Sequence, residues 1–237
     1  MNIPHKIQPF NIYRSEKPFG QAYLLSLKLL ECKSLLNFKE DILHPEEFEY
    51  FNHLVHPKRQ LSFLAGRWAV KELLQQFSPL AYSKILIQKG VFQQPVLLHP
   101  LLNRWACSIS HTDNRLVAMI FPSAHPMGID CETIQEQMEE KTQGAITYSE
   151  KQLAITQGLS NIEGKLWCAK EALSKCLTTG ITTPFRIFEI SQIEVMEGKY
   201  RFLFKNFPQY QVLLWEEEQE CMAICLPAES KLSKYLI

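Results

Sequence analysis

Trp167-Cys-Ala-Lys-Glu171 repeats an earlier segment of the chain, Trp68-Ala-Val-Lys-Glu72, at a distance of 99 residues. Two small or apolar residues follow each copy, Ala172-Leu173 and Leu73-Leu74, as the apolar face of a helix requires. Self-similarity at a fixed distance is the sequence signature of a duplicated structural unit. The two segments therefore predict two related halves, each with this helix at its centre.

The segments that follow the two predicted helices also correspond. A glycine and a proline interrupt the chain in each half, at Gly90-Val-Phe-Gln-Gln-Pro95 and at Gly180-Ile-Thr-Thr-Pro184. A strand-like apolar run comes later, at 116–121 in the first half and at 221–226 in the second. The duplication thus extends beyond the helix.

The boundary between the halves is expected at Pro122-Ser-Ala-His-Pro126, where two prolines end the strand pattern. This predicts an N-terminal lobe at 1–122 and a C-terminal lobe at 123–237, of about 118 residues each. We expect helices near 45–56, 59–77, 149–157 and 161–178, and strands near 83–89, 105–110, 115–121, 127–132, 186–195, 199–204, 210–215 and 220–226. The predicted fold class is α+β, a pseudo-dimer of two similar α/β lobes.

Composition excludes several classes of protein. The chain has 237 residues, of which 46% are hydrophobic, so it can bury a sizeable core. Its 25 basic and 25 acidic residues give a formal net charge of zero, so nothing in the overall charge favours nucleic acid or an anionic membrane as a partner. The first ten residues contain no apolar signal region, and no apolar run reaches the roughly 20 residues of a membrane span. We expect a cytoplasmic monomer.

Cysteine usage agrees with a reducing compartment. The chain has an odd number of cysteines, seven, and no secretion signal, which favours reduced thiols. Cys221 and Cys225 lie in an apolar run without a second ligand pair at zinc spacing. Buried structural thiols are therefore expected there rather than metal ligands.

Three short segments carry polar residues that chemistry can use. In Gly128-Ile-Asp-Cys-Glu132, the two carboxylates lie two residues apart and point to one face of a strand, where a divalent cation such as Mg²⁺ would relieve their repulsion. In 166–175, Glu171 and Lys175 share a helix face. In 107–113, Ser110-His111 ends an alternating strand. Taken singly, each has a plain structural explanation: a solvated acidic strand face, a surface ion pair and a turn.

Together and in this order, the three segments resemble the signature of the Sfp-type 4'-phosphopantetheinyl transferases. That signature is a Ser-His strand end, then Gly-(Ile/Val)-Asp-x-Glu, then Trp-x-x-Lys-Glu-(Ala/Ser)-x-x-Lys. Here these are Ser110-His111, Gly128–Glu132 and Trp167–Lys175. The family is also a pseudo-dimer of two α/β lobes with one active site between them, in agreement with the repeat.

The resemblance implies that the enzyme transfers the 4'-phosphopantetheine arm of coenzyme A (CoA) to a serine of an acyl or peptidyl carrier protein and releases adenosine 3',5'-bisphosphate. It implies Mg²⁺ as the metal, with Asp130, Glu132 and Glu171 as its ligands. Glu171 would also be the general base, directly or through a metal-bound water, and Lys175 would offset charge on the leaving phosphate. The residues implied to bind CoA are Ser110, His111, Lys170, Lys175, Lys89 and Arg67, the last of these either as a ligand or as a structural residue.

Part of the implied CoA site departs from the family pattern. Glu47 and Tyr50 stand where the family has basic residues, and the family's Gly-Lys-Pro turn is replaced by Gln93-Gln94-Pro95. Basic residues that can compensate are Lys58, Arg59, Arg67, Lys71 and Lys89. Glu72, in the first copy of the motif, has no Asp-x-Glu partner in its own half and is expected to serve packing.

Two other functions stay open at this point. Because several of the family's phosphate-binding basic residues are replaced in this chain, a non-catalytic relative that binds a carrier protein or CoA is one alternative. The carboxylates alone also allow an unrelated Mg²⁺-dependent phosphohydrolase. Neither the carrier protein nor its pathway follows from the sequence.

Overall fold

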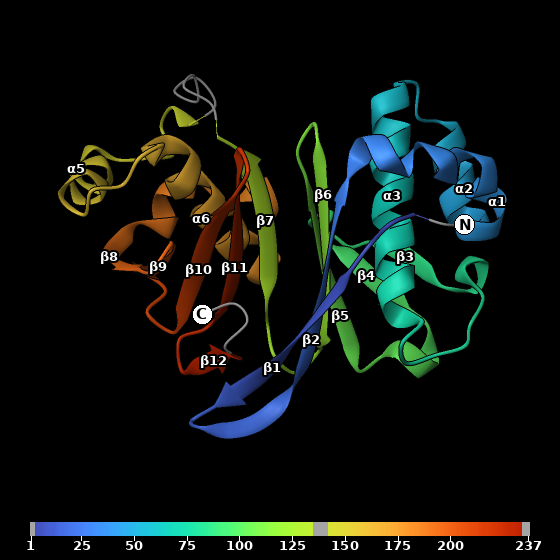
Figure 1. Cartoon of the computed structure of the whole chain (residues 1–237), viewed down its shortest axis with the longest axis horizontal. Helices are drawn as coiled ribbons and strands as arrows, with labels where there is room; N and C mark the ends of the chain where they lie inside the picture. The colour runs from blue at the N-terminus through green and yellow to red at the C-terminus, as the bar shows by residue number, and fades with distance from the viewer. Residues whose placement is uncertain (1–2, 135–141, 234–237) are drawn as a thin grey trace. The chain divides into compact units, whose positions relative to one another are not determined.

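The structure, a computed structural model, describes residues 3–134 and 142–233. Short connections link two sets of helices and strands (Figure 1). The first set comprises β1 (Ile7–Arg14), β2 (Lys17–Lys28), the 3-10 helix η1 (Leu29–Phe38), α1 (Lys39–Ile42), α2 (Pro45–Asn52), α3 (Pro57–Leu74), η2 (Tyr82–Lys84), β3 (Leu86–Lys89), β4 (Pro95–Leu98), η3 (Pro100–Leu102), β5 (Trp105–His111) and β6 (Arg115–Pro122). The second set comprises β7 (Gly128–Thr133), α5 (Tyr148–Thr156), α6 (Ile162–Cys176), η4 (Gly180–Thr182), η5 (Phe185–Phe188), β8 (Ile190–Met196), β9 (Lys199–Phe204), β10 (Tyr210–Glu217), β11 (Glu220–Pro227) and β12 (Ser230–Leu232).

Contacts within the chain divide it into two compact units. One holds Met1–Asn11 and Gly20–Ala124, and the other holds Ile12–Phe19 and His125–Ile237. The short segment Ile12–Phe19 belongs with the second unit because β12 pairs with the last residues of β1. The predicted division at 122/123 did not anticipate that Ile12–Phe19 belongs with the second unit.

In the first unit, the antiparallel strands β1-β2-β6-β5 form a sheet, and β3 and β4 form a separate hairpin. Helix α3 begins at a proline in its first turn and packs against β5, β6 and η1 (Figure 1). Its glycine, Gly66, lets the helix approach Ile109 closely, since a Cβ there would lie 3.3 Å from the Ile109 side chain. Trp68 is buried in this core.

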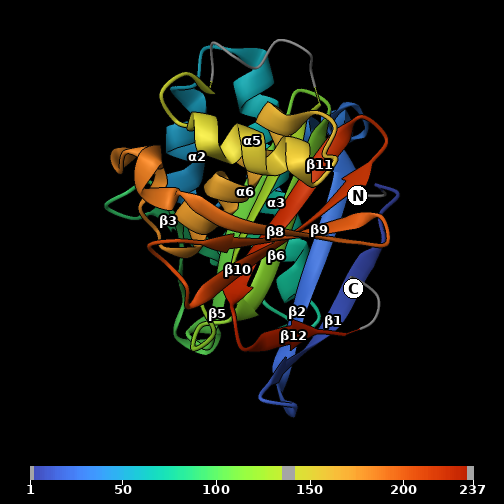
Figure 2. The same ribbon diagram turned by 90° about the vertical axis from the view of Figure 1, so that its left-hand side faces the viewer.

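In the second unit, the sheet has the order β7-β11-β10-β9-β8 and is antiparallel throughout. Helix α6 packs against β7, β10 and β11, and α5 packs against α6 and β8 (Figure 2). The contact between α6 and β7 needs a glycine at position 128, because a Cβ there would lie 2.4 Å from the Ala172 carbonyl oxygen and from the Cys176 amide nitrogen. This close approach brings the acidic strand against the motif-bearing helix.

The two units repeat one plan. Strands β2, β6 and β5 correspond to β7, β11 and β10, and the β3–β4 hairpin corresponds to β8–β9. The repeat extends to single hydrogen bonds. Glu47 and Glu150, 103 residues apart, each accept one hydrogen bond from a buried lysine and one from a backbone amide of a strand. The expected α+β fold class is confirmed.

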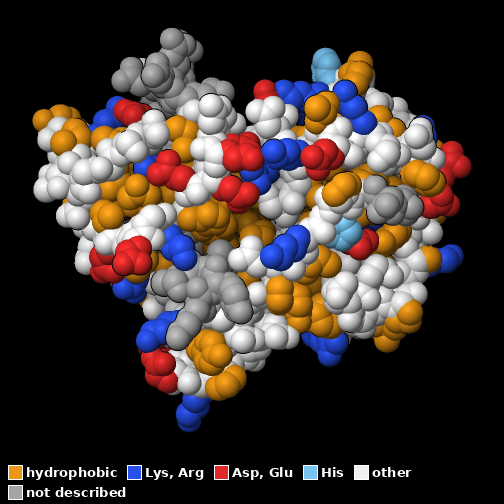
Figure 3. Space-filling view, in the orientation of Figure 1, with side chains coloured by type: hydrophobic (Ala, Val, Ile, Leu, Met, Phe, Trp, Pro, Cys, Tyr) orange, Lys and Arg blue, Asp and Glu red, His pale blue; other side chains and the backbone are white. Residues whose placement is uncertain are grey.

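Two general features of the described chain bear on its partners. Lys and Arg side chains are interspersed with Asp and Glu over the face shown in Figure 3, in line with the net charge of zero. None of the helices within 3–134 and 142–233 is long and apolar enough to cross a membrane.

Candidate active site

Two carboxylates of strand β7 lie beside helix α6. Asp130 and Glu132 are two residues apart on this strand, as the alternation of a strand predicted. Asp130 is buried, with 2% of its surface exposed, and Glu132 is half-buried. An ionised carboxylate buried this deeply needs a positive partner, since desolvation otherwise disfavours its charge.

Lys175, in the last turn of α6, is that partner. Its Nζ lies 2.6 Å from Asp130 Oδ1, and a quarter of the lysine side chain is exposed. Burial disfavours the ammonium, but the negative charges of Asp130 and Glu171 outweigh it and raise the pKa of Lys175. The lysine is therefore protonated at neutral pH, with its charge held at the acidic strand.

Glu132 is held by a second α6 residue. The indole nitrogen of Trp167 donates a hydrogen bond to Glu132 Oε1 at 2.9 Å. The Trp167 ring stacks on Phe185, with 4.7 Å between ring centroids and an interplanar angle of 8°. Glu171 lies on the same helix, half-buried, and its charge acts on Lys175. The structure thus gathers Asp130, Glu132, Trp167, Glu171 and Lys175 along one helix and one strand.

The chemistry of these carboxylates suits a hard cation, because Mg²⁺ prefers oxygen ligands. Within the described residues, however, no group of three or more His, Cys, Asp or Glu side chains is arranged to hold a metal ion. Lys175 contacts Asp130, and Trp167 contacts Glu132. Mg²⁺ usually binds through one or two protein carboxylates together with substrate phosphates, so donors of this type fit it without a preformed cage. The predicted ligand set stays a prediction.

Lys170, which the sequence analysis placed among the CoA-binding residues, is surrounded by acceptors of the protein itself. Its side chain is fully buried, and its Nζ lies 2.7 Å from a Glu150 carboxylate oxygen and 2.6 Å from the Ala145 carbonyl oxygen. The ammonium also donates to the Phe185 carbonyl. Burial lowers the pKa of Lys170, while Glu150 opposes that shift. A lysine with three internal acceptors and no exposed surface cannot reach a phosphate.

Glu47 is the first-unit counterpart of Glu150, because it accepts a hydrogen bond from the buried Lys71. The sequence analysis did not predict this role. Glu47 is buried and accepts hydrogen bonds from Lys71, from the Ile87 amide at 3.0 Å and from the His44 amide at 2.9 Å. It is therefore a structural carboxylate and not a lost phosphate contact. The available signal was the pairing of Glu47 with Glu150, since each is the third residue of a helix with a capping box.

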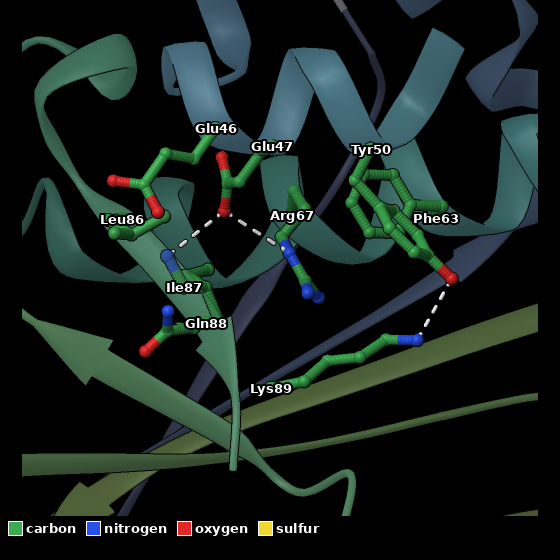
Figure 4. A pocket seen from close by; sticks show the side chains of 9 residues that line it. All are labelled: Glu46, Glu47, Tyr50, Phe63, Arg67, Leu86, Ile87, Gln88 and Lys89. Carbon is green, nitrogen blue, oxygen red and sulfur yellow. Dashed lines mark hydrogen bonds and ion pairs between the residues drawn. The ribbon is translucent and has the colours of Figure 1, made fainter. Parts of the chain in front are cut away.

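A cavity with both acidic and basic side chains in its lining, Glu46 and Glu47 among them, lies beside this network (Figure 4). It has a volume of about 220 Å³ and is lined in part by Tyr50, Phe63, Arg67 and Lys89. Lys89 Nζ donates to the Tyr50 hydroxyl at 2.9 Å, and this hydrogen bond lowers the pKa of Tyr50. The Arg67 guanidinium lies 4.5 Å from the centre of the Phe63 ring.

A second cavity of about 200 Å³ shares several of these lining residues and adds Arg59, Pro95 and His111. Three of the predicted CoA-binding residues, Arg67, Lys89 and His111, thus line one connected region. Ser110 is buried on β5 and is not among the lining residues. Gln94 serves its own loop, where its side chain accepts from the Phe92 amide at 3.0 Å.

The first unit has no carboxylates at the two positions equivalent to Asp130 and Glu132. In the register of the two sheets, Ala118 faces Leu25 and Ala223 faces Asp130; likewise Leu116 faces Leu27 and Cys221 faces Glu132. The positions of Asp130 and Glu132 are therefore taken by two buried leucines. Glu72 is bonded to the Tyr82 hydroxyl and lies 3.3 Å from His5. The expectation that Glu72 serves packing agrees with these contacts.

Comparisons with known proteins find one family model and several relatives. Residues 126–225 match the 4'-phosphopantetheinyl transferase superfamily. The chain is 29% identical over 120 residues to the holo-[acyl-carrier-protein] synthase of Onion yellows phytoplasma, covering 43% of this chain and 94% of that protein. It is 31% identical over 90 residues to the holo-[acyl-carrier-protein] synthase of Lactococcus lactis subsp. cremoris, covering 35% of this chain and 76% of that protein. Among solved structures, a holo-(acyl-carrier-protein) synthase from Bacillus anthracis in complex with CoA (3',5'-ADP) matches 48% of this chain and 94% of its own, with 22% identity and a TM-score of 0.38.

Proposed function

Because the chain belongs to the 4'-phosphopantetheinyl transferase superfamily, a family of transferase enzymes, we propose that it transfers 4'-phosphopantetheine from CoA to a serine of an acyl or peptidyl carrier protein. The other product is adenosine 3',5'-bisphosphate. The observation that carries the proposal is the acidic strand held against α6, where Lys175 lies 2.6 Å from Asp130 and Trp167 lies 2.9 Å from Glu132.

The proposed metal is Mg²⁺, with Asp130, Glu132 and Glu171 as its protein ligands. When bound, the ion would neutralise charge on the diphosphate oxygens of CoA. The residues that fit it are carboxylates on one strand and one helix, which is the donor type that Mg²⁺ prefers.

The remaining chemistry belongs to side chains of α6. Attack by a serine hydroxyl needs removal of its proton, and Glu171 is the proposed base, either directly or through a water. Lys175 is the proposed counter-charge for the leaving phosphate, because its raised pKa keeps it protonated.

We propose that the nucleotide part of CoA binds at the two cavities of the first unit. Arg59, Arg67, Lys89 and His111 line them, and charge-assisted hydrogen bonds from such groups are strong contacts for phosphate. Ser110 is a proposed neighbour of this site. Replacement of Lys89 by alanine is expected to raise the KM for CoA more than that for 3'-dephospho-CoA. Replacement of Lys205, which pairs with Glu189 in the second unit, should raise neither.

The proposed setting is a monomer in a reducing compartment such as the cytoplasm. All seven cysteines are buried and free, which supports reduced thiols. The proposed carrier is acidic near its serine and docks on a basic or apolar surface.

A non-catalytic relative that binds CoA or a carrier is the second candidate, favoured by the Gln93-Gln94-Pro95 turn that lacks a lysine. Calorimetry separates the two candidates. The enzyme should bind CoA more tightly with Mg²⁺ than without it, whereas the non-catalytic relative should bind a carrier with no effect of Mg²⁺ on CoA. Incubation with CoA, Mg²⁺ and a panel of apo carriers, read by intact mass, then tests the transfer itself. No mass gain on any carrier would overturn the proposed function.

A further inference from the structure

The Trp167 side chain contacts a carboxylate of strand β7. Its indole N–H donates to Glu132 Oε1 at 2.9 Å, so one oxygen of this carboxylate is held in a defined position. Glu132 is only half-buried, and this contact reduces the number of rotamers that its side chain can adopt. The hydrogen bond therefore restricts a group that the proposed reaction uses.

The first unit shows that the fold itself does not need this hydrogen bond. Its equivalent tryptophan, Trp68, is buried in the core, and its indole nitrogen has no hydrogen-bond partner among the residues that the structure describes. The position equivalent to Glu132 is Leu27, which cannot accept a hydrogen bond. The same scaffold therefore exists with and without the contact, and only the second unit uses it.

The Trp167 ring is fixed by its own neighbours. Phe185 stacks on it at 4.7 Å, and Phe188 packs edge-on against Phe185 at 5.6 Å. The Phe185 backbone is tied to α6 as well, because its carbonyl accepts from Lys170 Nζ at 3.4 Å. Packing against Phe185, whose backbone is held by Lys170, thereby restricts the direction of the indole N–H.

We infer that Trp167 is a positioning residue, which orients the Glu132 carboxylate for the divalent cation through its indole N–H. The inference rests on the proposed function, since it assigns Glu132 to the metal. Partners that orient a metal-binding side chain typically change metal affinity or activity by about 10- to 100-fold when removed.

The test uses the full chain and Mn²⁺ as the probe. Trp167→Phe keeps an aromatic ring against Phe185 and removes the N–H, and Trp68→Phe is the matched control because its N–H has no acceptor. Mn²⁺ affinity is measured calorimetrically for the wild type, both single variants, Glu132→Gln and the double variant Trp167→Phe/Glu132→Gln. The expected result is an affinity loss of about tenfold or more for Trp167→Phe and none for Trp68→Phe. In the Glu132→Gln background, Trp167→Phe should have no further effect, because the carboxylate that it orients is gone.

A spectroscopic measurement makes the test independent of metal binding. With ¹⁵N-labelled tryptophan, the four indole signals are assigned by losing one signal in each Trp→Phe variant. Glu132→Gln should shift the Trp167 indole signal and leave that of Trp68 in place. An unmoved Trp167 signal, or equal Mn²⁺ affinities for Trp167→Phe and the wild type, would overturn the inference. If the wild type transfers no phosphopantetheine but the Trp167 signal and Mn²⁺ affinity change as expected, the proposed function fails and the positioning role stands.

Discussion

Lys175 Nζ lies 2.6 Å from Asp130 Oδ1, and the two partners differ in exposure: a quarter of the lysine side chain is exposed, against 3% of the aspartate side chain. The buried Asp130 carboxylate therefore depends on Lys175 for a counter-charge more than Lys175 depends on Asp130. Part of the lysine side chain is exposed to solvent, whereas almost none of the aspartate side chain is, so water cannot replace the ammonium at the buried oxygen.

This asymmetry predicts unequal costs of removing each partner. Lys175→Met leaves a buried carboxylate without its cation and should lower the free energy of unfolding by about 3 kcal/mol. Asp130→Asn leaves a lysine that can turn to water and should cost clearly less. Urea unfolding at pH 7 measures both, and a larger loss for Asp130→Asn would contradict the arrangement.

Lys170 should behave as a core residue. Its ammonium and the Glu150 carboxylate are both fully buried, so Lys170→Met should destabilise the chain by about 3–5 kcal/mol. Lys71→Met is the matched variant of the first unit and should cost less, because Arg67 also lies 3.2 Å from the remaining Glu47 carboxylate. Urea unfolding compares the two variants. A selective rise in the KM for CoA, with stability unchanged, would instead assign Lys170 to the ligand.

Phe185 has no hydroxyl group, and we expect this to keep the Glu171 carboxylate basic enough to accept the serine proton. Phe185 corresponds to Tyr82 of the first unit, 103 residues earlier, whose hydroxyl donates to Glu72. Phe185→Tyr should place a hydroxyl against Glu171 and lower its basicity, so kcat should fall by roughly tenfold or more with little change in KM.

The control for this change is Tyr82→Phe, which removes the hydroxyl from Glu72 in the first unit and should leave the transfer rate unaltered. Steady-state kinetics with CoA and an apo carrier give both values. A fully active Phe185→Tyr variant would argue against Glu171 as the base.

His125 should make stability depend on pH. It is buried, with its Nε2 2.8 Å from the Ser230 hydroxyl, and burial lowers its pKa from 6.5 to about 4. Between these values the unfolded chain binds a proton that the folded chain does not. The free energy of unfolding should therefore fall as the pH drops from about 6.5 to about 4, by up to roughly 3 kcal/mol from this group.

His125→Gln can keep a hydrogen bond to Ser230 but does not titrate. The difference in unfolding free energy between the two chains, followed by urea titration at several pH values, isolates the histidine from other groups. Parallel pH profiles for the two chains would exclude this role.

Much of the fold followed from the repeat, because local patterns carry it. The tryptophan motif predicted the helices that became α3 and α6, and strand-like patterns predicted β5, β6, β7 and β10. The strands that the sequence analysis did not predict depend on partners far away in the chain. Strand β12 has only three residues, and it is a strand because it pairs with residues near Ile12. The β1–β2 hairpin was missed as well, since Pro9 and the mixed composition of β1 resemble a loop.

The members of the proposed site came from the resemblance to the transferase family, which implied that Asp130, Glu132, Glu171 and Lys175 act together. Their contacts did not follow from the sequence. Nor did the sequence indicate that Lys170 bonds to Glu150, because that pair joins two helices across 20 residues of chain. Glu47 was misread for the same reason: its partners Lys71 and Ile87 lie 24 and 40 residues away.

The central claim is that one of two similar motif copies performs the transfer. It is tested most directly by intact-mass measurement of an apo carrier protein incubated with CoA and Mg²⁺ and with the wild type, Glu171→Gln or Glu72→Gln. A mass gain of one phosphopantetheine is expected for the wild type and for Glu72→Gln, and none for Glu171→Gln. Equal modification by Glu171→Gln and the wild type, or its loss in Glu72→Gln alone, would show that the second motif copy does not perform the transfer.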